Sequence, residues 1–215
     1  MPPAAALDLL SGLTRDYAVL DANGELIASY DTLYFDTPGL DFFHSHRCGR
    51  RVRHKVRIRH YPDRRISFLD VKSRRSELQS TKICRAHEYG DNQMSPGDRA
   101  FVLQHTGAQR PVSAQVWTRF SRVTLLNFAG NERVTIDLDL RVDTETRSRS
   151  FGEIAILEVK QCPSSAQTPV MTALRSAGRR PGWASKYCVG IVSTRHGVRF
   201  NNLLPGFRAL ERGAA

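Results

Sequence analysis

The sequence predicts an α+β fold in which a large antiparallel sheet closes into a barrel and helices pack outside it. Stretches that alternate apolar and polar residues, as strands do, outnumber the stretches with a helical pattern. Most of the longer stretches also carry charged residues on one of their two faces. A barrel with those faces turned inward has no open edges and encloses a polar cavity. Because no change in composition divides the 215 residues, we expect one domain over residues 1–215.

Eight stretches are predicted as strands: residues 18–20, 26–35, 52–61, 66–72, 117–127, 133–142, 154–160 and 187–192. In the third of these, a period of two places four cations on one face, namely Arg53, Lys55, Arg57 and Arg59. The same interpretation of the sixth stretch groups Arg133, Thr135, Asp137, Asp139 and Arg141. Two stretches end in an acid-x-Lys triplet, Asp70-Val71-Lys72 and Glu158-Val159-Lys160. Each long strand therefore contributes charge to a common interior.

Five stretches are predicted as helices: residues 4–11, 38–48, 95–105, 168–177 and 206–212. Ser95 and Thr168 are expected N-caps, because each precedes a proline at the first helical position. The second helix bears on metal binding, because it contains His44, His46 and Cys48. On a strand these three side chains would share a face, but a helix turns them apart. We therefore expect no transition-metal site there.

The net charge is the property that narrows the function most. Lys and Arg number 32 against 21 Asp and Glu, which gives +11 and a pI near 10.1. Residues 47–85 hold 14 basic and 3 acidic residues, so this segment carries the whole surplus. The surplus favours a polyanionic partner. Aromatic residues are not interleaved with the cations as base-stacking requires, so no specific nucleic acid is expected.

Phosphate is the anion that these residue types fit best. Arginine holds phosphate oxygens with a planar fork, and lysine adds a point charge. A carboxylate among such cations is useful when it holds a divalent cation that bridges phosphate oxygens. Glu158 is the candidate for this role, and Asp70, Asp137 and Asp139 either share it or act as counter-ions of neighbouring arginines. The chain contains no P-loop, no GxGxxG and no kinase motifs.

Five motifs resemble those of a known family in order and spacing: TLYFDTPGLDFFHSHRCGRRVRHKVRIRHY, SFLDVK, RVTIDLDLRV, ILEVKQ and SKYCVG. From about residue 16 to residue 210 the chain resembles the VTC domain. This domain is the polyphosphate polymerase module of the vacuolar transporter chaperone complex and of free-standing bacterial relatives, within the CYTH or triphosphate tunnel superfamily. The resemblance implies a tunnel that transfers the terminal phosphoryl group of ATP onto polyphosphate with Mn²⁺ or Mg²⁺.

The resemblance also assigns roles to individual residues. It implies phosphate ligands that act in catalysis at Arg57, Arg59, Lys72, Arg122, Arg133 and Lys160. Further phosphate ligands fall on Lys82 and Lys186, and the metal carboxylate falls on Glu158. Asp70 stands where the family has glutamate, and Arg85 does not fit the usual K-x-R spacing after Lys82.

Family members usually begin with a strand that holds a Lys-Tyr pair and contributes a lysine to the tunnel. This chain begins after it, in the stretch leading to DYAVLDANGEL, so we expect a gap in the barrel and an exposed edge. Two alternatives remain open: a tunnel triphosphatase that hydrolyses inorganic or organic triphosphate, and a protein that binds polyphosphate or nucleic acid without turnover. No apolar run approaches the length of a membrane span, and we expect a cytoplasmic protein.

Overall fold

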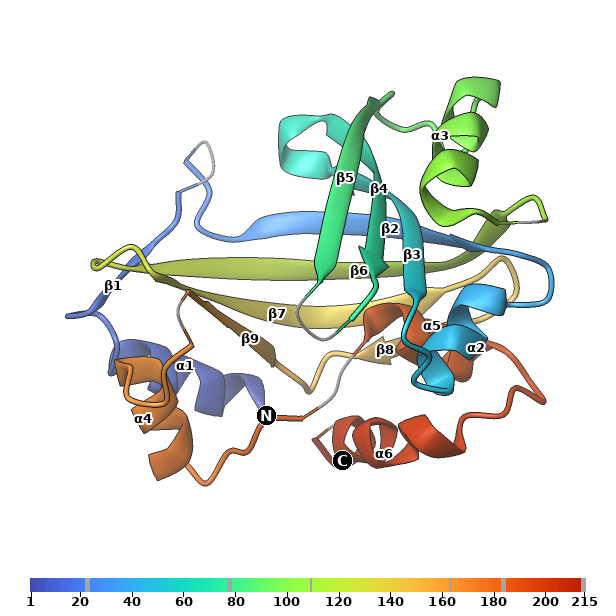
Figure 1. Ribbon diagram of the computed structural model, residues 1–215. Helices are drawn as coiled ribbons and strands as arrows, with labels where there is room; N and C mark the ends of the chain where they lie inside the picture. Colours follow the sequence, from blue (N-terminus) through green and yellow to red (C-terminus); the bar gives the residue numbers. More distant parts are fainter. Residues whose placement is uncertain (22–23, 77–78, 109, 163, 183–184, 214–215) are drawn as a thin grey trace.

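A curled antiparallel sheet forms the centre of the computed structural model, which describes the chain except residues 22–23, 77–78, 109, 163, 183–184 and 214–215 (Figure 1). In the described residues nine strands follow the order β5-β4-β3-β2-β6-β7-β8, with β1 added beside β6 and β9 beside β7. The strands are β1 (Tyr17–Val19), β2 (Ala28–Asp36), β3 (Arg53–Tyr61), β4 (Ile66–Arg74), β5 (Ser80–His87), β6 (Ser113–Asn127), β7 (Glu132–Asp143), β8 (Ser148–Phe151) and β9 (Ile156–Gln161). The α+β antiparallel fold is thus confirmed.

Helices surround the sheet. They are α1 (Pro3–Ser11), α2 (Asp41–Arg47), α3 (Pro96–Thr106), α4 (Pro169–Ser176), α5 (Lys186–Thr194) and α6 (Leu204–Gly213), with short 3₁₀ turns at Pro62–Arg64 and Asn201–Leu203. Ser95 and Thr168 both stand at the predicted N-cap positions, but the Thr168 side chain makes no capping bond and donates to Glu132 instead. Ser95 accepts a hydrogen bond from the Asp98 N–H at the start of α3, and the Asp98 side chain bonds back to the Ser95 N–H in a capping box.

The sheet does not close into a barrel. No ladder between described residues joins β5 to β8 or β9, so these three strands are edges. Closure would need neighbouring backbones about 4.8 Å apart along a shared register. A closed barrel is therefore wrong, whereas the open sheet with its exposed strand β5 agrees with the expected gap and exposed edge. The sheet is strongly curled, so that β3, β4 and β5 cross in front of β6 (Figure 1).

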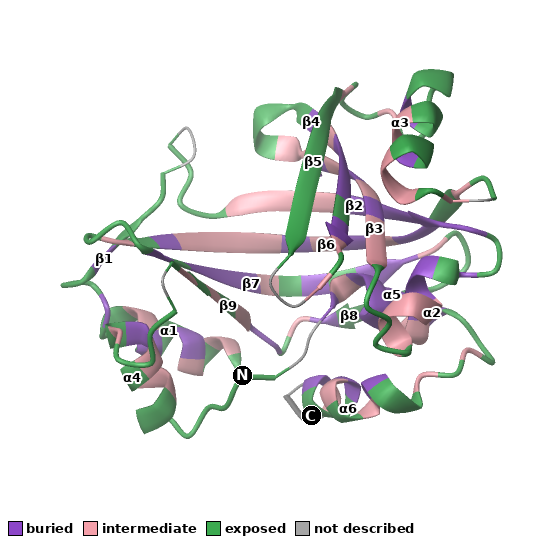
Figure 2. Ribbon diagram, viewed as in Figure 1, coloured by how far each residue is buried: buried purple, intermediate pink, exposed green. Residues whose placement is uncertain are grey.

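Apolar side chains on the convex face of the sheet form two cores. Under α3, Leu33, Val56, Ile58, Leu69 and Val71 are buried on β2, β3 and β4. Burying each such side chain stabilises the fold by about 1.5–3 kcal/mol. Figure 2 shows β4 and β7 as largely buried, whereas β5 is exposed along its length. The predicted alternation on β3 is confirmed, because its apolar residues face this core and its cations face the other way.

The second convex core lies under α1 and α4. It contains Leu9, Leu125, Val134, Ile136 and Val170, which come from α1, β6, β7 and α4. These helices cover the outer side of β6, β7 and β9, as the predicted helical segments 4–11 and 168–177 require. The inward sides of the same strands are left free for polar residues.

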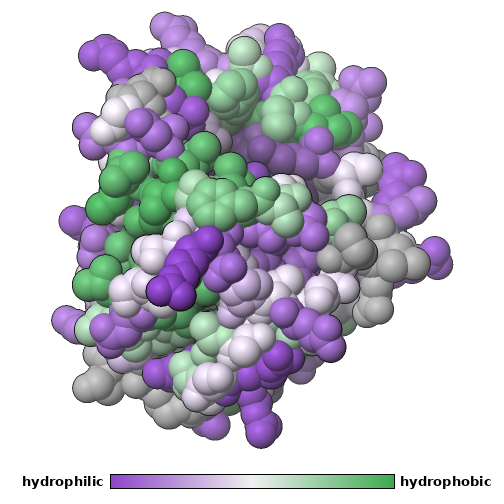
Figure 3. All heavy atoms as spheres, turned by 90° about the vertical axis from the view of Figure 1, so that its left-hand side faces the viewer, coloured by the Kyte–Doolittle hydropathy of each residue, from purple (hydrophilic) through white to green (hydrophobic). Residues whose placement is uncertain are grey.

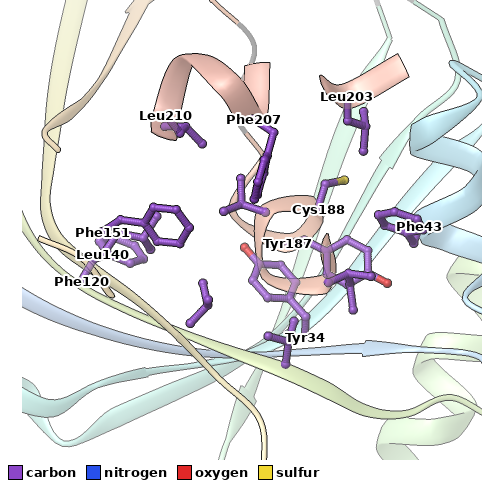
Figure 4. Packing of buried hydrophobic residues seen from close by; sticks show 14 of the residues in the cluster. Tyr34, Phe43, Phe120, Leu140, Phe151, Tyr187, Cys188, Leu203, Phe207 and Leu210 are labelled. Atoms are coloured by element: carbon purple, nitrogen blue, oxygen red, sulfur yellow. The ribbon is translucent and has the colours of Figure 1, made fainter. Parts of the chain in front are cut away.

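A third core lies on the concave side, around α5. Figure 4 shows Tyr187 of α5 beside Tyr34 of β2 and Phe43 of α2, with Phe120 and Leu140 in the same cluster. The helix lies close to β6, because a Cβ on Gly190 would be 2.9 Å from Cγ2 of Val116. Glycine is the residue that permits this approach. The helix α5 therefore fills one end of the space inside the sheet.

One predicted element is wrong, and two strands were not predicted. Residues 187–192 form helix α5 rather than a strand, since Ser185 caps the helix by accepting from the Cys188 N–H and packing buries most of its sides. The strand β5 was not predicted, because its side chains are exposed and lack an apolar face. The four-residue strand β8 was also not predicted, because it is too short for a period to be recognised.

A break in the alternation of β7 also differs from expectation. Asp139 has a left-handed backbone (φ 53°), and the register between β6 and β7 shifts between Arg119 and Ser121. After this break Leu140 and Val142 belong to the core around α5, and Arg141 is exposed. Asp139 and Arg141 therefore do not share the face of Arg133.

Candidate functional site

The concave side of the sheet encloses a cavity of about 730 Å³. Nine cationic side chains line it, from β3, β4, β5, β6, β7, β9 and the start of α5: Lys55, Arg57, Arg59, Lys72, Lys82, Arg122, Arg133, Lys160 and Lys186. In the described part of the chain, Glu158 is the one acidic residue of the lining. The cavity is thus strongly positive.

All residues that the sequence analysis selected as site residues line this cavity. They are Arg57, Arg59, Lys72, Lys82, Arg122, Arg133, Glu158, Lys160 and Lys186. Arg85 lies outside it and donates to the Gly97 carbonyl at 2.9 Å. Asp139, which was a possible metal ligand, is exposed beyond the break in β7 and is not in the lining.

Asp70 lies outside the cavity lining and forms ion pairs with two of the cations in that lining, Arg57 and Lys82. Its carboxylate accepts from Nε of Arg57 at 2.9 Å and lies 3.2 Å from Nζ of Lys82. The Asp70 side chain is only 2% exposed. Burial by itself would raise the pKa of Asp70, but Arg57 and Arg59 lower it below its usual value. Asp70 is therefore a charged counter-ion that points Arg57 and Lys82 into the cavity.

Asp137 has the same function on the opposite wall. Its two oxygens accept from Arg122 Nε at 2.5 Å and Arg122 Nη2 at 2.8 Å, and it also accepts from Nζ of Lys186. Burial would raise its pKa, but the hydrogen bonds from Arg122 and the charge of Lys186 lower it. A bidentate Arg–carboxylate pair fixes the guanidinium plane. Asp70 and Asp137 thus act as counter-ions, the second of the two roles foreseen for them.

Aromatic rings surround Arg59, which has no carboxylate within ion-pair distance among the described residues. The guanidinium of Arg59 lies 5.6 Å from the Tyr30 ring and 6.0 Å from the Tyr61 ring, and it donates to the Tyr61 hydroxyl at 3.5 Å. Tyr30 stacks on Phe120, and Arg122 lies 4.9 Å from the Tyr30 ring. Sequence reasoning missed these aromatic residues. Their positions on the inward faces of β2, β3 and β6 were the signal that could have identified them.

Lys55 is a further lining residue that was not selected as a site residue. It stands directly opposite Lys72 in the β3–β4 ladder. In the described residues neither lysine has a carboxylate within ion-pair distance. Burial lowers the pKa of both ammonium groups, and the charge of Lys55 lowers that of Lys72 further. Like charges directly opposite each other are destabilising, so an anion between them would relieve the repulsion.

Glu158 has the properties of a ligand for a hard divalent cation. Its Oε1 lies 3.2 Å from Nζ of Lys160, and its side chain is half exposed to the cavity. Burial would raise its pKa, but Lys160 and Arg122 lower it, so the carboxylate is charged. Among the residues described, no three His, Cys, Asp or Glu side chains group as a metal site. A metal here would therefore take its other ligands from phosphate oxygens and water.

One mouth of the cavity has an apolar rim. Leu20 and Leu126 line the cavity and are 46% and 39% exposed. Leu20 follows β1, and Leu126 lies near the end of β6. Figure 3 shows apolar side chains gathered on the side of the molecule where β1 lies. Arg133 stands opposite Leu126 in the β6–β7 ladder, so a cation borders this rim.

A curled antiparallel sheet around a cationic cavity places the protein in the class of triphosphate tunnel (CYTH-like) folds. The model of the VTC domain matches residues 1–195, so the chain belongs to the VTC domain family. Among solved structures, the chain is similar to the adenylyl cyclase candidate HpAC1 from Hippeastrum, which is described as having a dominant triphosphatase activity. The two share 17% identity with a TM-score of 0.59 over 92% of this chain and 94% of that one. This likeness supports the fold.

The curated proteins include no match to this chain. None of the described helices is long and apolar enough to cross a membrane.

Proposed function

We propose that this chain is a metal-dependent phosphotransferase that moves the terminal phosphoryl group of ATP onto a polyphosphate chain held in the cavity. The main support is the convergence of nine cations around one carboxylate in a single concave site. Polyphosphate is charged along its whole length, so it matches a cavity with cations on every wall. Membership of the VTC domain family supports the same substrate class.

The arginines would bind and orient the phosphates. Asp70 and Asp137 already fix Arg57 and Arg122 from the protein side, so little side-chain freedom is lost when phosphate binds. Preorganised cations stabilise the charge that develops on the transferred group and its oxygens. Arg59 and Arg133 have no carboxylate partner among the described residues, so their charges are available to the substrate.

Glu158 would hold the divalent ion, Mg²⁺ or Mn²⁺. Such an ion would supply Lewis-acid chemistry, lowering the negative charge on the group in transfer. Lys160 keeps the Glu158 carboxylate charged and is itself within reach of the phosphates. The chain's own contribution is to bind the phosphates in line and to shield them from bulk water on the α5 side.

A tunnel triphosphatase is the second candidate. The similar fold from Hippeastrum, described with a dominant triphosphatase activity, favours it. The two reactions use the same phosphate ligands and differ in the acceptor, which is water in one case and a phosphate chain in the other. The cationic cavity fits both reactions.

Nucleic acid is a weaker candidate. The guanidinium-bearing side chains of Arg57 and Arg122 are only 17% and 14% exposed, and Lys186 is 15% exposed. Cations that bind a duplex lie on an accessible surface, where phosphates of both strands reach them. The inward placement of these residues favours a free phosphate chain.

The deciding experiment incubates the protein with ATP and Mn²⁺ and separates long polymer from free phosphate. The phosphotransferase proposal predicts polymer as the main product, and free phosphate alone would instead support the triphosphatase. Glu158→Gln should abolish metal-dependent turnover and leave tripolyphosphate affinity within about threefold. The matched control is Glu153→Gln, an exposed glutamate outside the cavity lining, which should keep full activity. An unchanged rate in Glu158→Gln would remove Glu158 from the mechanism.

A further inference from the structure

A second cavity, of about 500 Å³, lies beside β9 on the side of that strand opposite the first cavity. Its walls come from β9, from α4 and from the segment that follows α4. Its floor is apolar and consists of Ala155, Leu157, Val159, Met171 and Leu174. Leu157 and Val159 also pack in the core under α1 and α4. The floor is therefore a rigid part of the fold.

Three arginines line this second cavity: Arg175, Arg179 and Arg180. None of them has a carboxylate within ion-pair distance among the described residues. Arg175 donates to the hydroxyl of Thr172 at 3.2 Å, which is a neutral partner. All three arginines are exposed to solvent, so their charges are accessible to an anion that enters the cavity. The cavity thus offers three arginine side chains to a single anionic ligand.

The two cavities are adjacent along the chain and in space. Glu158 lines both of them. Gly182 lines the second cavity, and Ser185, three positions later, lines the first. In the described residues β9 pairs with β7 alone, so its other edge carries no neighbouring strand. A flexible chain that leaves the first cavity at Glu158 can pass this free edge and reach the arginines.

We propose that Arg175, Arg179 and Arg180 form an outer subsite for polyphosphate, which binds the part of a long chain that extends beyond the first cavity. This inference rests on the proposed function, because it concerns the same phosphate chain. The proposal requires that tripolyphosphate bound in the first cavity leaves the outer subsite empty. The outer subsite therefore makes affinity depend on chain length, which is useful to an enzyme that extends a polymer and of no use to one that hydrolyses triphosphate.

The test compares the binding of tripolyphosphate and of long-chain polyphosphate by calorimetry in the same buffer. The variant is Arg175→Ala/Arg179→Ala/Arg180→Ala. The matched control is Arg50→Ala/Arg99→Ala/Arg208→Ala, which removes the same charge from residues that line neither cavity. Partly exposed arginine–phosphate contacts each contribute modestly, so three of them should change long-chain affinity by about tenfold.

If the outer subsite exists, the variant should bind long-chain polyphosphate about tenfold more weakly and tripolyphosphate with unchanged affinity. The control should bind both ligands with unchanged affinity. Equal losses for both ligands would mean that the arginines add only a general positive field, which would overturn the inference. No loss for either ligand would overturn it as well. If the unmodified protein bound neither ligand, the proposed function itself would fail, so the two failures are distinguishable.

Discussion

Replacing Lys55 by methionine should make the ligand-free protein more stable and the phosphate complex weaker. Lys55 stands opposite Lys72 in the β3–β4 ladder, and neither has a carboxylate partner among the described residues. Relief of one directly opposed like-charge pair contributes about 0.2–1 kcal/mol, and methionine fills a similar volume. A gain near 1 kcal/mol corresponds to a Tm about 3 °C higher in a chain of this size. The same change removes a charge-assisted hydrogen bond to phosphate, worth about 1.5–3 kcal/mol.

The assay is urea unfolding with and without tripolyphosphate, together with calorimetric titration of that ligand. Without tripolyphosphate, the Lys55→Met variant should unfold at a higher urea concentration than the unmodified protein. It should also bind tripolyphosphate about 10–100-fold more weakly. The control is Arg208→Met, which removes one charge from an exposed position on α6 and should change neither quantity. If Lys55→Met destabilised the ligand-free protein or kept full affinity, Lys55 would be a packing residue and the reasoning about uncompensated charge would be refuted.

Three other predictions concern the supports of the cavity. Asp137→Asn leaves Arg122 and Lys186 without their carboxylate partner, so it should lower the free energy of unfolding in urea by about 3 kcal/mol. With tripolyphosphate present the loss should be clearly smaller, because the phosphate compensates the two cations. Equal losses with and without tripolyphosphate would contradict the account. Asp70 has a lowered pKa, so it stabilises the fold above the ordinary value of 3.8, and this contribution is lost as the pH falls through the lowered pKa. Below about pH 4, the free energy of unfolding of Asp70→Asn should therefore vary less with pH than that of the unmodified protein. Parallel pH profiles would contradict a charged Asp70 carboxylate in the folded protein. Gly190→Ala should lower the free energy of unfolding in urea by about 1–3 kcal/mol, because the new Cβ would be 2.9 Å from a methyl carbon of Val116. An unchanged urea midpoint would mean that α5 can move away from β6.

Much of the fold was predictable because most strands have one polar and one apolar face. On β3 the period of two placed Val56 and Ile58 in the core and Arg57 and Arg59 in the cavity, as the structure has them. The alternation failed where the backbone departs from a regular strand, at the left-handed Asp139. No local sequence feature predicts that break, because the break depends on the register between β6 and β7.

The site residues were selected partly from charge patterns and partly from the family resemblance, and the structure brings them all to one cavity. What the sequence did not reveal is how the cations are held. The pairing of Asp137 with both Arg122 and Lys186 joins positions up to 49 residues apart in the chain, and the rings around Arg59 come from separate strands. Such contacts depend on tertiary packing. Helix α5 was mistaken for a strand for the same reason, since packing on nearly all sides removes the amphipathic pattern.

The most direct test of the phosphate-binding cavity is a crystal structure of the protein with tripolyphosphate. The account predicts phosphate oxygens within hydrogen-bond distance of Arg57, Arg59 and Arg122, on the concave side of the sheet between β3 and β6. A ligand bound only on the outer surface, with the cavity cations in contact with water alone, would contradict it.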